Sequence, residues 1–397
     1  MNGVLFVDDE PDVLNGLRNV FRVDRARWHM GFAQGGEAAL QELAARPFGV
    51  IVTDMRMPRM DGLELLKRVR AGHPQVARIV LSGHAELDLV LRASALAHQY
   101  LPKPSEAKVL RAVIDRALGL QALIASDRLR QAVGALGSLP SAPGAYHRLK
   151  AALADPNVEI RALASIVKGD VGLAVRVLQF VNSAYCGLVE RVTSIEGAIT
   201  CLGIDTLCHL ALTVDVLRDF GACATQLFGR LEGHALLTAS LACKLVSDPA
   251  RRETAFAAGL LHDAGRLVLA SRAPAEYARV LEEAQRSKRL LSEVEGEAFG
   301  ATHSEIGAYL FGLWDLPHEL VEAVAYHHES ERLGRAGAET LTAVAIANAL
   351  AHWLGGKDDG SLTPADWDRL AAPGDLERWR ELARAEALRL GSGPGPS

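Results

Sequence analysis

The chain is 397 residues long, 49% of them hydrophobic and 23% charged, and its formal net charge is −5. This length exceeds what one ordinary hydrophobic core holds, so we expect two or three domains. The acidic balance and the absence of any run of Lys or Arg give no support for binding to nucleic acid or to an anionic membrane surface.

The cysteines and the apolar stretches predict a cellular compartment. No Cys-x-x-Cys spacing occurs, and we expect reduced, mostly buried thiols. The longest apolar stretch, residues 341–354, is too short to span a bilayer, and the sequence begins directly with a strand pattern rather than a leader segment. We therefore expect a soluble, cytoplasmic protein. The five cysteines are Cys186, Cys201, Cys208, Cys223 and Cys243.

Four short apolar stretches near the N-terminus predict strands that are buried on both faces, as in a parallel sheet. They are residues 4–7, 50–54, 77–81 and the strand around residues 100–101. Pro58 cannot donate a ladder hydrogen bond, so the second of these strands must end before it, and residues 63–69 have a helical pattern. The pattern predicts an open α/β sheet, in which ligands bind at the carboxyl ends of the strands.

Each of these strands ends in a residue that can carry chemistry. The acidic pair Asp8-Asp9 follows the first, Asp54 ends the second, Ser82 follows the third and Lys103 the fourth. Clustered carboxylates repel one another, and a hard cation such as Mg²⁺ relieves that repulsion. A metal beside Asp54, with a lysine and a hydroxyl nearby, suits phosphoryl transfer to a carboxylate. The alternative is a strand-end Asp54 that caps the next helix.

Residues 1–120 resemble the receiver domain of two-component response regulators. The resemblance implies a doubly wound, five-stranded parallel sheet of the flavodoxin-like kind. It makes Asp54 the phosphoryl acceptor and Asp8 and Asp9 the Mg²⁺ pair, with Asp9 and the backbone carbonyl of Arg56 as direct ligands. The same resemblance implies a histidine kinase as the phosphoryl donor.

The resemblance also assigns residues that sense the phosphoryl group. Lys103 would pair with the phosphoryl oxygens, and the peptide bond before Pro104 would be cis. Ser82 and Tyr100 occupy the positions of the switch hydroxyl and the switch aromatic ring, and Tyr100 would rotate inward on phosphorylation. The last receiver helix should begin at Ser105, a favourable N-cap residue.

The remaining sequence predicts helices only. Residues 121–138 form a weakly amphipathic helical linker, and residues 139–355 read as helix after helix, punctuated by glycines such as Gly203 and Gly233. Residues 356–397 would be a helical extension with a flexible tail rich in Gly and Pro. We expect an α/β domain followed by an all-α domain.

The span 139–355 resembles the HDOD domain, an output module related to the HD phosphohydrolases and generally regarded as non-catalytic. The resemblance rests on residues 163–170, 178–185, 194–195 and 202–203, and on the HD signature at 259–266 with related segments at 314–317 and 326–329. It implies a helical fold that signals by binding a protein or a nucleotide.

A set of histidines leaves open whether this domain does chemistry. An HD phosphohydrolase holds one or two metal ions on His and Asp ligands from several helices. The candidate ligands, for a divalent metal such as Fe or Mn, are His234, His262, Asp263, His303, His327, His328 and Asn348.

Three departures from the enzyme pattern weigh against catalysis. Asn348 stands where HD enzymes have an Asp, and Arg266 stands where they usually have a Lys. The Gly-Tyr-Pro segment of the cyclic di-GMP phosphodiesterase branch is missing after His328-Glu329. The sequence therefore favours a phosphorelay response regulator with a non-catalytic output domain.

The alternative is a phospho-gated, metal-dependent phosphohydrolase that acts on a nucleotide or a cyclic dinucleotide. Direct DNA binding is disfavoured because no basic recognition helix is present. Whether the chain forms a homodimer, and which partner lies downstream, stay open.

Overall fold

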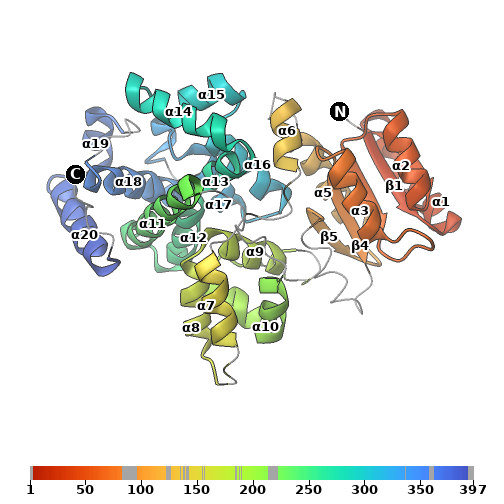
Figure 1. Cartoon of the computed structure of the whole chain (residues 1–397), viewed down its shortest axis with the longest axis horizontal. Helices are drawn as coiled ribbons and strands as arrows, with labels where there is room; N and C mark the ends of the chain where they lie inside the picture. The colour runs from red at the N-terminus through yellow and green to blue at the C-terminus, as the bar shows by residue number, and fades with distance from the viewer. Residues whose placement is uncertain are drawn as a thin grey trace. The chain divides into compact units, whose positions relative to one another are not determined.

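The computed structural model describes residues 3–391, apart from 83–95, 122–126, 135, 137–138, 140–142, 154, 156, 184–185, 187, 189, 213–221, 336 and 357–361. The chain divides into two compact units (Figure 1). The first contains residues 1–138, with which the segments 179–191 and 309–316 are grouped, and the second contains the rest. The predicted tail beyond Gly391 lies outside the described residues.

The first unit alternates strands and helices. Its elements are β1 (Gly3–Asp8), α1 (Pro11–Val20), the 3-10 helix η1 (Phe21–Ala26), β2 (His29–Gln34), α2 (Gly36–Ala45), β3 (Val50–Asp54), α3 (Gly62–Gly72), β4 (Ala77–Ser82), β5 (Gln99–Pro102), α5 (Ala107–Gln121) and α6 (Asp127–Gly134). All of its strand pairs are parallel, and the sheet order is β2-β1-β3-β4-β5. The predicted five-stranded parallel sheet is confirmed.

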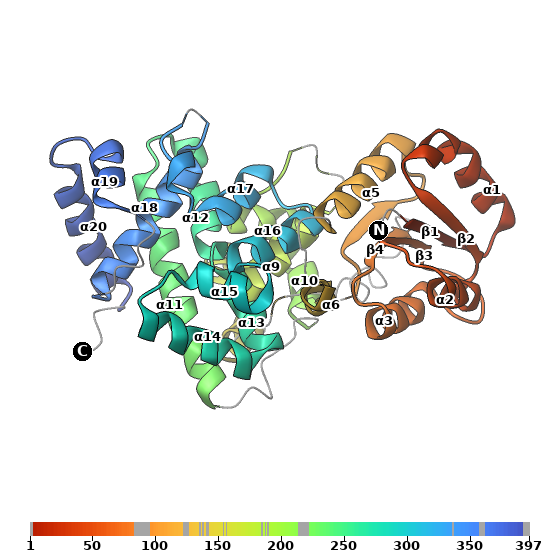
Figure 2. The same ribbon diagram turned by 90° about the horizontal axis from the view of Figure 1, so that it is seen from above.

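The central strands are apolar because helices cover both faces of the sheet. All six residues of β1 and the first four of β3 are buried. Figure 2 shows α1 and α5 on one face and α2 and α3 on the other. Every strand therefore points its carboxyl end toward the same edge, as the βαβ connection requires.

The turn after β3 is fixed by two residues. Asp61 caps α3, because its side chain accepts a hydrogen bond from the Glu64 N–H at 2.8 Å. A Cβ atom on Gly62 would lie 2.3 Å from the backbone oxygen of Asp54, so only glycine allows α3 to start this close to the strand. Asp54 itself is free of the capping role. One boundary differs from the prediction, since α5 begins at Ala107 rather than at Ser105.

A buried arginine holds the linker helix α6 against the amino end of β4. The side chain of Arg78 is completely buried, and its guanidinium donates to the carbonyl oxygens of Pro74, Val76, Leu96 and, at 2.8 Å, Gly134. Burial lowers the pKa of Arg78 to about 9. Backbone carbonyls thus satisfy a buried cation, which would otherwise be strongly destabilising.

The second unit is helical throughout its described residues, as predicted. Its elements are α7 (Pro143–Leu153), α8 (Ile160–Lys168), α9 (Val171–Val181), α10 (Ile195–Leu212), α11 (Ala222–Leu245), η3 (Pro249–Arg251), α12 (Arg252–Leu261), α13 (Ala264–Arg272), α14 (Pro274–Ser287), α15 (Leu291–Phe299), α16 (His303–Leu313), α17 (His318–Tyr326), η4 (Ser330–Arg332), α18 (Glu339–Leu354), α19 (Pro364–Leu370) and α20 (Asp375–Arg389). The ends of α9 and α16 fall in the segments grouped with the first unit.

The long helix α11 lies at the centre of this unit. It packs against α12 and α18, and α12 also packs against α17 and α18. Gly203 interrupts α10, where its φ of 77° is outside the helical region, as the glycine pattern predicts. The prediction for Gly233 is wrong, because α11 continues through it. The packing of the whole helix α11 on α12 and α18 outweighs the low helix propensity of one glycine.

The C-terminal helix α20 is tied back to α11 by one buried carboxylate. Glu386 is 1% exposed and accepts hydrogen bonds from Ser240 and Lys244 of α11 and from Arg389. Burial raises the pKa of Glu386, but these three donors outweigh it and lower the pKa to about 2. The extension after residue 355 is therefore part of the packed helical unit.

Two properties predicted from composition can be compared with the described residues. Cys186, Cys201 and Cys243 are free thiols, but Cys201 is exposed and the other two are half-buried, so the prediction of mostly buried thiols is wrong for them. Cys186 lies between α9 and α10, and Cys201 and Cys243 lie on parts of α10 and α11 that are not fully buried. Among the described helices, none has the length and apolar character needed to cross a membrane.

Candidate functional site

The first candidate site is an acidic cluster at the carboxyl edge of the sheet. β1 and β3 are neighbours and end in Asp8 and Asp54, and Lys103 follows the end of β5. The Lys103 Nζ atom lies 2.7 Å from Asp54 Oδ1 and 3.0 Å from Asp8 Oδ2. The sheet topology therefore brings together three residues that are far apart in the sequence.

Asp54 is more exposed than Asp8, so Asp54 is the carboxylate that a reactant can reach. The Asp8 side chain is 3% exposed and is held by the Glu10 N–H, whereas the Asp54 side chain is 14% exposed and can be approached. Burial lowers the pKa of Lys103, but its bonds to Asp54 and Asp8 outweigh burial and raise the pKa above the ordinary value. Lys103 is therefore a cation that neutralises part of the acidic cluster.

The other predicted receiver residues lie around this cluster to different degrees. Asp9 is half-buried next to Asp8, and the side chain of Arg56 is exposed two residues after Asp54. Ser82 ends β4, beside β3, but its side chain lies outside the described residues. The ring of Tyr100 is 2% exposed, so it already points inward. The peptide bond between Lys103 and Pro104 is cis, as the resemblance implies.

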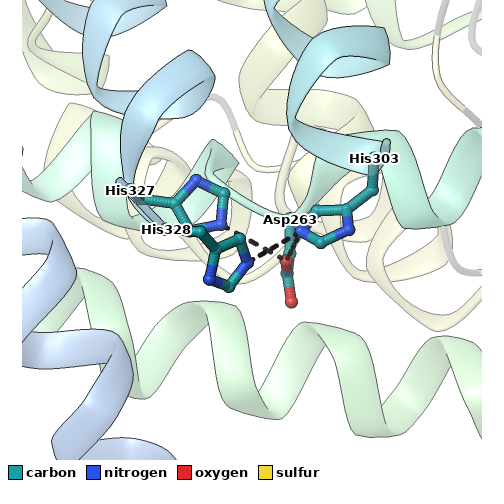
Figure 3. A group of neighbouring side chains, drawn as sticks. All are labelled: Asp263, His303, His327 and His328. Atoms are coloured by element: carbon teal, nitrogen blue, oxygen red, sulfur yellow. Dashed lines mark hydrogen bonds and ion pairs between the residues drawn. The ribbon is translucent and has the colours of Figure 1, made fainter. Parts of the chain in front are cut away.

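The second candidate site lies where several helices of the second unit end. His262 and Asp263 connect α12 to α13, His303 is the first residue of α16, and His327 and His328 follow α17. Figure 3 shows the three imidazoles of His303, His327 and His328 turned toward the carboxylate of Asp263. His234 of α11 and Asn348 of α18 complete the predicted set. Five predicted histidines thus surround Asp263, and Asn348 joins the group through its contact with His234.

Three of the imidazoles are held through their Nδ1 atoms. His262 Nδ1 lies 2.7 Å from the Gly259 carbonyl oxygen, His327 Nδ1 lies 2.9 Å from that of Val324, and His303 Nδ1 lies 2.6 Å from a Glu295 carboxylate oxygen. A carbonyl oxygen can only accept a hydrogen bond, so the proton of His262 and of His327 lies on Nδ1 and Nε2 keeps its lone pair. His303 likewise donates from Nδ1 to Glu295. Such support by carbonyl and carboxylate groups is typical of histidines that bind metal ions.

Two of these Nε2 atoms are buried polar atoms without a hydrogen-bond partner. His262 and His327 are at most 1% exposed, and neither Nε2 has a partner in the described residues. Burial lowers the pKa of both rings, because it disfavours their charged form. A buried lone pair without a donor is costly unless a cation or a water fills the space, so these residues fit a metal ion.

A buried ring of side chains surrounds Asp263, and sequence reasoning missed two of its members. Arg266 Nη1 donates to Asp263 Oδ2 at 2.7 Å and its Nε donates to the Tyr277 hydroxyl at 3.1 Å. That hydroxyl donates to Glu295, which in turn holds His303. Tyr277 and Glu295 lie on α14 and α15, and no motif or spacing in the sequence marks them.

A glycine makes this arrangement possible. A Cβ atom on Gly265 would lie 1.9 Å from the backbone oxygen of His303. Because glycine has no Cβ, the start of α13 can pack directly on the start of α16. The Gly that follows the His-Asp pair thereby brings Asp263 next to His303, although forty residues separate them in the sequence.

The imidazole of His234 is held through its Nε2 atom rather than through Nδ1. His234 Nε2 lies 2.9 Å from the amide oxygen of Asn348, and burial lowers the pKa of His234 to about 3. His352, one turn after Asn348 on α18, contacts His234 in a tilted arrangement with 4.5 Å between the ring centroids. Sequence reasoning did not include His352, although its spacing of four residues from Asn348 puts both on one helix face.

Comparisons with known families agree with both units. The family described as "Response regulator receiver domain" matches residues 4–115, and the family described as "HDOD domain" matches residues 139–330. The chain is a response regulator with a receiver domain and an HDOD domain. Receiver domains generally bind Mg²⁺ for phosphorylation, and the carboxylates of Asp8, Asp9 and Asp54 are the oxygen ligands that this ion prefers.

Known relatives of this response regulator match parts of it. An uncharacterised protein of Treponema pallidum (strain Nichols) is 26% identical over 226 residues, which are 56% of this chain and 44% of the relative. The transcriptional regulatory protein FixJ of Bradyrhizobium diazoefficiens is 33% identical over 116 residues, 29% of this chain and 56% of FixJ. The chain thus matches about half the length of these curated relatives.

Among solved structures, the MmoQ response regulator of Methylococcus capsulatus is similar at 25% identity. The match covers 61% of this response regulator and 98% of the MmoQ chain, with a TM-score of 0.49.

Proposed function

We propose that this response regulator accepts a phosphoryl group on Asp54 from a partner histidine kinase and passes the signal to its HDOD domain. The observation that carries the proposal is the contact of Lys103 with both Asp54 and Asp8 at the open edge of the sheet. A structural ion pair would need one carboxylate. Two carboxylates and one lysine at an edge of the sheet where Asp54 can be approached instead support a site for a phosphoryl group and a cation.

The chemistry follows from the groups present. An Asp54 oxygen attacks phosphorus, the bond from phosphorus to the donor's histidine nitrogen breaks, and an acyl phosphate forms on Asp54. Mg²⁺, held by Asp8, Asp9 and the Arg56 carbonyl, would neutralise charge on the transferring phosphoryl oxygens. Lys103 would then move from Asp54 Oδ1 to a phosphoryl oxygen, since the new group carries more negative charge.

The response would reach the output domain through the face of the receiver that contains α5. The Ser82 hydroxyl and Lys103 would contact the phosphoryl group, and Tyr100 would repack with the loop that follows β4. The HDOD domain would signal by binding another protein or a nucleotide.

Phosphoryl uptake by the full chain tests the proposal. With acetyl phosphate and Mg²⁺, intact-mass measurement should find one added phosphoryl group per chain, and chelation of Mg²⁺ should prevent it. Uptake that continues at the same rate after chelation would contradict the proposed role of the acidic pair.

We also propose that the HDOD domain binds a divalent metal ion such as Fe²⁺ or Mn²⁺. The buried lone pair on His327 Nε2, which lies 4.0 Å from Asp263 Oδ1, supports this. A phospho-gated phosphohydrolase is the corresponding second candidate function, because a metal ion in such a site can activate water and bind a phosphate.

Two measurements on the full chain test the phosphohydrolase function. Elemental analysis determines bound metal, and an assay with bis(4-nitrophenyl) phosphate determines hydrolysis. Bound metal with turnover that the variant Asp263→Asn loses would support a hydrolase. Bound metal without turnover would leave a structural or sensing metal in a binding domain.

A further inference from the structure

The two carboxylate oxygens of Asp263 face different groups. Oδ1 lies 3.3 Å from His303 Nε2 and 4.0 Å from His327 Nε2. Oδ2 lies 2.7 Å from Arg266 Nη1, 3.6 Å from His262 Nε2 and 4.0 Å from His234 Nε2. Asp263 therefore separates two groups of possible ligands, which we call the Oδ1 side (Asp263, His303, His327, His328) and the Oδ2 side (Asp263, His234, His262).

Two distances on the Oδ1 side match the edges of a coordination polyhedron. Ligand atoms at about 2.05 Å from a tetrahedral metal ion lie about 3.3 Å from one another. His303 Nε2 lies 3.1 Å from His328 Nε2 and 3.3 Å from Asp263 Oδ1. These two separations therefore already suit one ion, whereas His327 Nε2 lies 4.0 Å from Asp263 Oδ1 and would move closer on binding. All four ligand atoms lie within 4.8 Å of one another, and Figure 3 shows the four side chains grouped together.

The ligands on the Oδ1 side are also oriented before a metal arrives. Glu295 is completely buried, and it accepts hydrogen bonds from both the backbone N–H and the Nδ1 of His303. The neutral carbonyl of Val324 accepts a hydrogen bond from the Nδ1 of His327 alone. A negative group behind a histidine raises the basicity of its Nε2 atom and so strengthens metal binding.

On the Oδ2 side, most of the possible ligand atoms are already engaged in other contacts. Its carboxylate oxygen already accepts the hydrogen bond of Arg266, and His234 Nε2 is engaged with the neutral Asn348 amide. His262 Nε2 alone keeps an unpartnered lone pair there. A cation bound to Oδ2 would also lie next to the guanidinium charge of Arg266, and two like charges a few ångström apart in a buried site repel strongly.

We propose that one divalent metal ion binds on the Oδ1 side, held by Asp263, His303, His327 and His328, and that Arg266 provides the positive charge on the Oδ2 side. The inference rests on the proposed metal binding by the HDOD domain and adds which residues hold the ion and how many ions bind. Three imidazoles and one carboxylate suit Zn²⁺, Fe²⁺ or Mn²⁺. Glu295 is a positioning residue that acts through His303.

A Co²⁺ titration of the metal-free full chain tests the proposal, with calorimetry for stoichiometry and visible absorption for coordination geometry. The wild-type chain should bind one ion. His328→Ala should weaken binding at least about tenfold and change the spectrum, because it removes a direct ligand. His234→Ala is matched to it, since both rings are half-buried, and it should keep one ion with an unchanged spectrum.

Three other results of the Co²⁺ titration would each contradict a different part of the proposal. Loss of the ion in His234→Ala but not in His328→Ala would place the metal on the Oδ2 side and overturn the assignment. Two ions per wild-type chain would overturn the role of Arg266. No binding by a folded wild-type chain would overturn the metal proposal itself. Circular dichroism monitors folding, and His328→Gln replaces His328→Ala if the latter unfolds.

The positioning role of Glu295 has its own readout. Glu295→Gln keeps the shape of the side chain but removes the charge behind His303. We expect about 10- to 100-fold weaker Co²⁺ binding with the stoichiometry and spectrum retained. Unchanged affinity would show that Glu295 serves packing only.

Discussion

Asp54→Asn is expected to abolish phosphoryl uptake by this response regulator. The amide is nearly the same size as the carboxylate, so β3 and the turn after it should keep their structure. It lacks the anionic oxygen that attacks phosphorus, and it removes one negative charge from the group that Lys103 neutralises. Intact-mass measurement after incubation with acetyl phosphate and Mg²⁺ should find no added phosphoryl group, against one per chain in the wild type.

A matched variant separates this effect from general damage to the loop. Asp61→Asn makes the same chemical change seven residues later, at the N-cap of α3. Asparagine caps helices about as well as aspartate, so α3 should persist and uptake should continue. Phosphorylation of Asp54→Asn at the wild-type rate would remove the centre of the proposed function.

Lys103→Ala has the second-largest expected effect, and it acts on the response rather than on the chemistry. Asp54 and the acidic pair remain, so phosphoryl uptake should continue. The phosphorylated variant lacks the cation that would draw the loop after β5 toward the phosphoryl group. We therefore expect that phosphorylation no longer changes hydrogen exchange in α5, whereas in the wild type it should alter exchange there.

A second readout makes this variant informative in the unphosphorylated state. Removing a positive charge that lies 2.7 Å from Asp54 and 3.0 Å from Asp8 leaves the acidic cluster more negative, so Mg²⁺ should bind more tightly. Lys67→Ala, on the exposed face of α3, is the control and should change neither property. A normal exchange response in phosphorylated Lys103→Ala would contradict the proposed role of the lysine.

The histidine cluster indicates how an HD-type domain can keep a metal-like site while losing the enzyme pattern. Asn348 and Arg266 both lie on the Oδ2 side of Asp263, where each removes or replaces a charge. The histidines of the Oδ1 side keep their buried support from Glu295 and Val324. Two of the three departures that weigh against catalysis are therefore on one side of the site.

The sequence by itself determined the receiver site. Asp8, Asp54 and Lys103 each follow a short apolar strand, and parallel strands in one sheet bring their carboxyl ends to a common edge. Strand pattern and chain order were therefore enough to predict that these residues meet. β2 was not placed in advance, because its residues are less uniformly apolar than those of β1 and β3.

Only the tertiary structure decided the arrangement around Asp263. The sequence named seven residues of the histidine site but could not divide them, because the relative positions of helix ends depend on how helices pack over long distances in the chain. The close contact at Gly265, the support of His303 by Glu295 and the pairing of Arg266 with one carboxylate oxygen leave no periodic pattern in the sequence. In the receiver the regular geometry of a sheet aligns the chemical groups, whereas in the helical domain each contact between helices is set by its own side-chain packing.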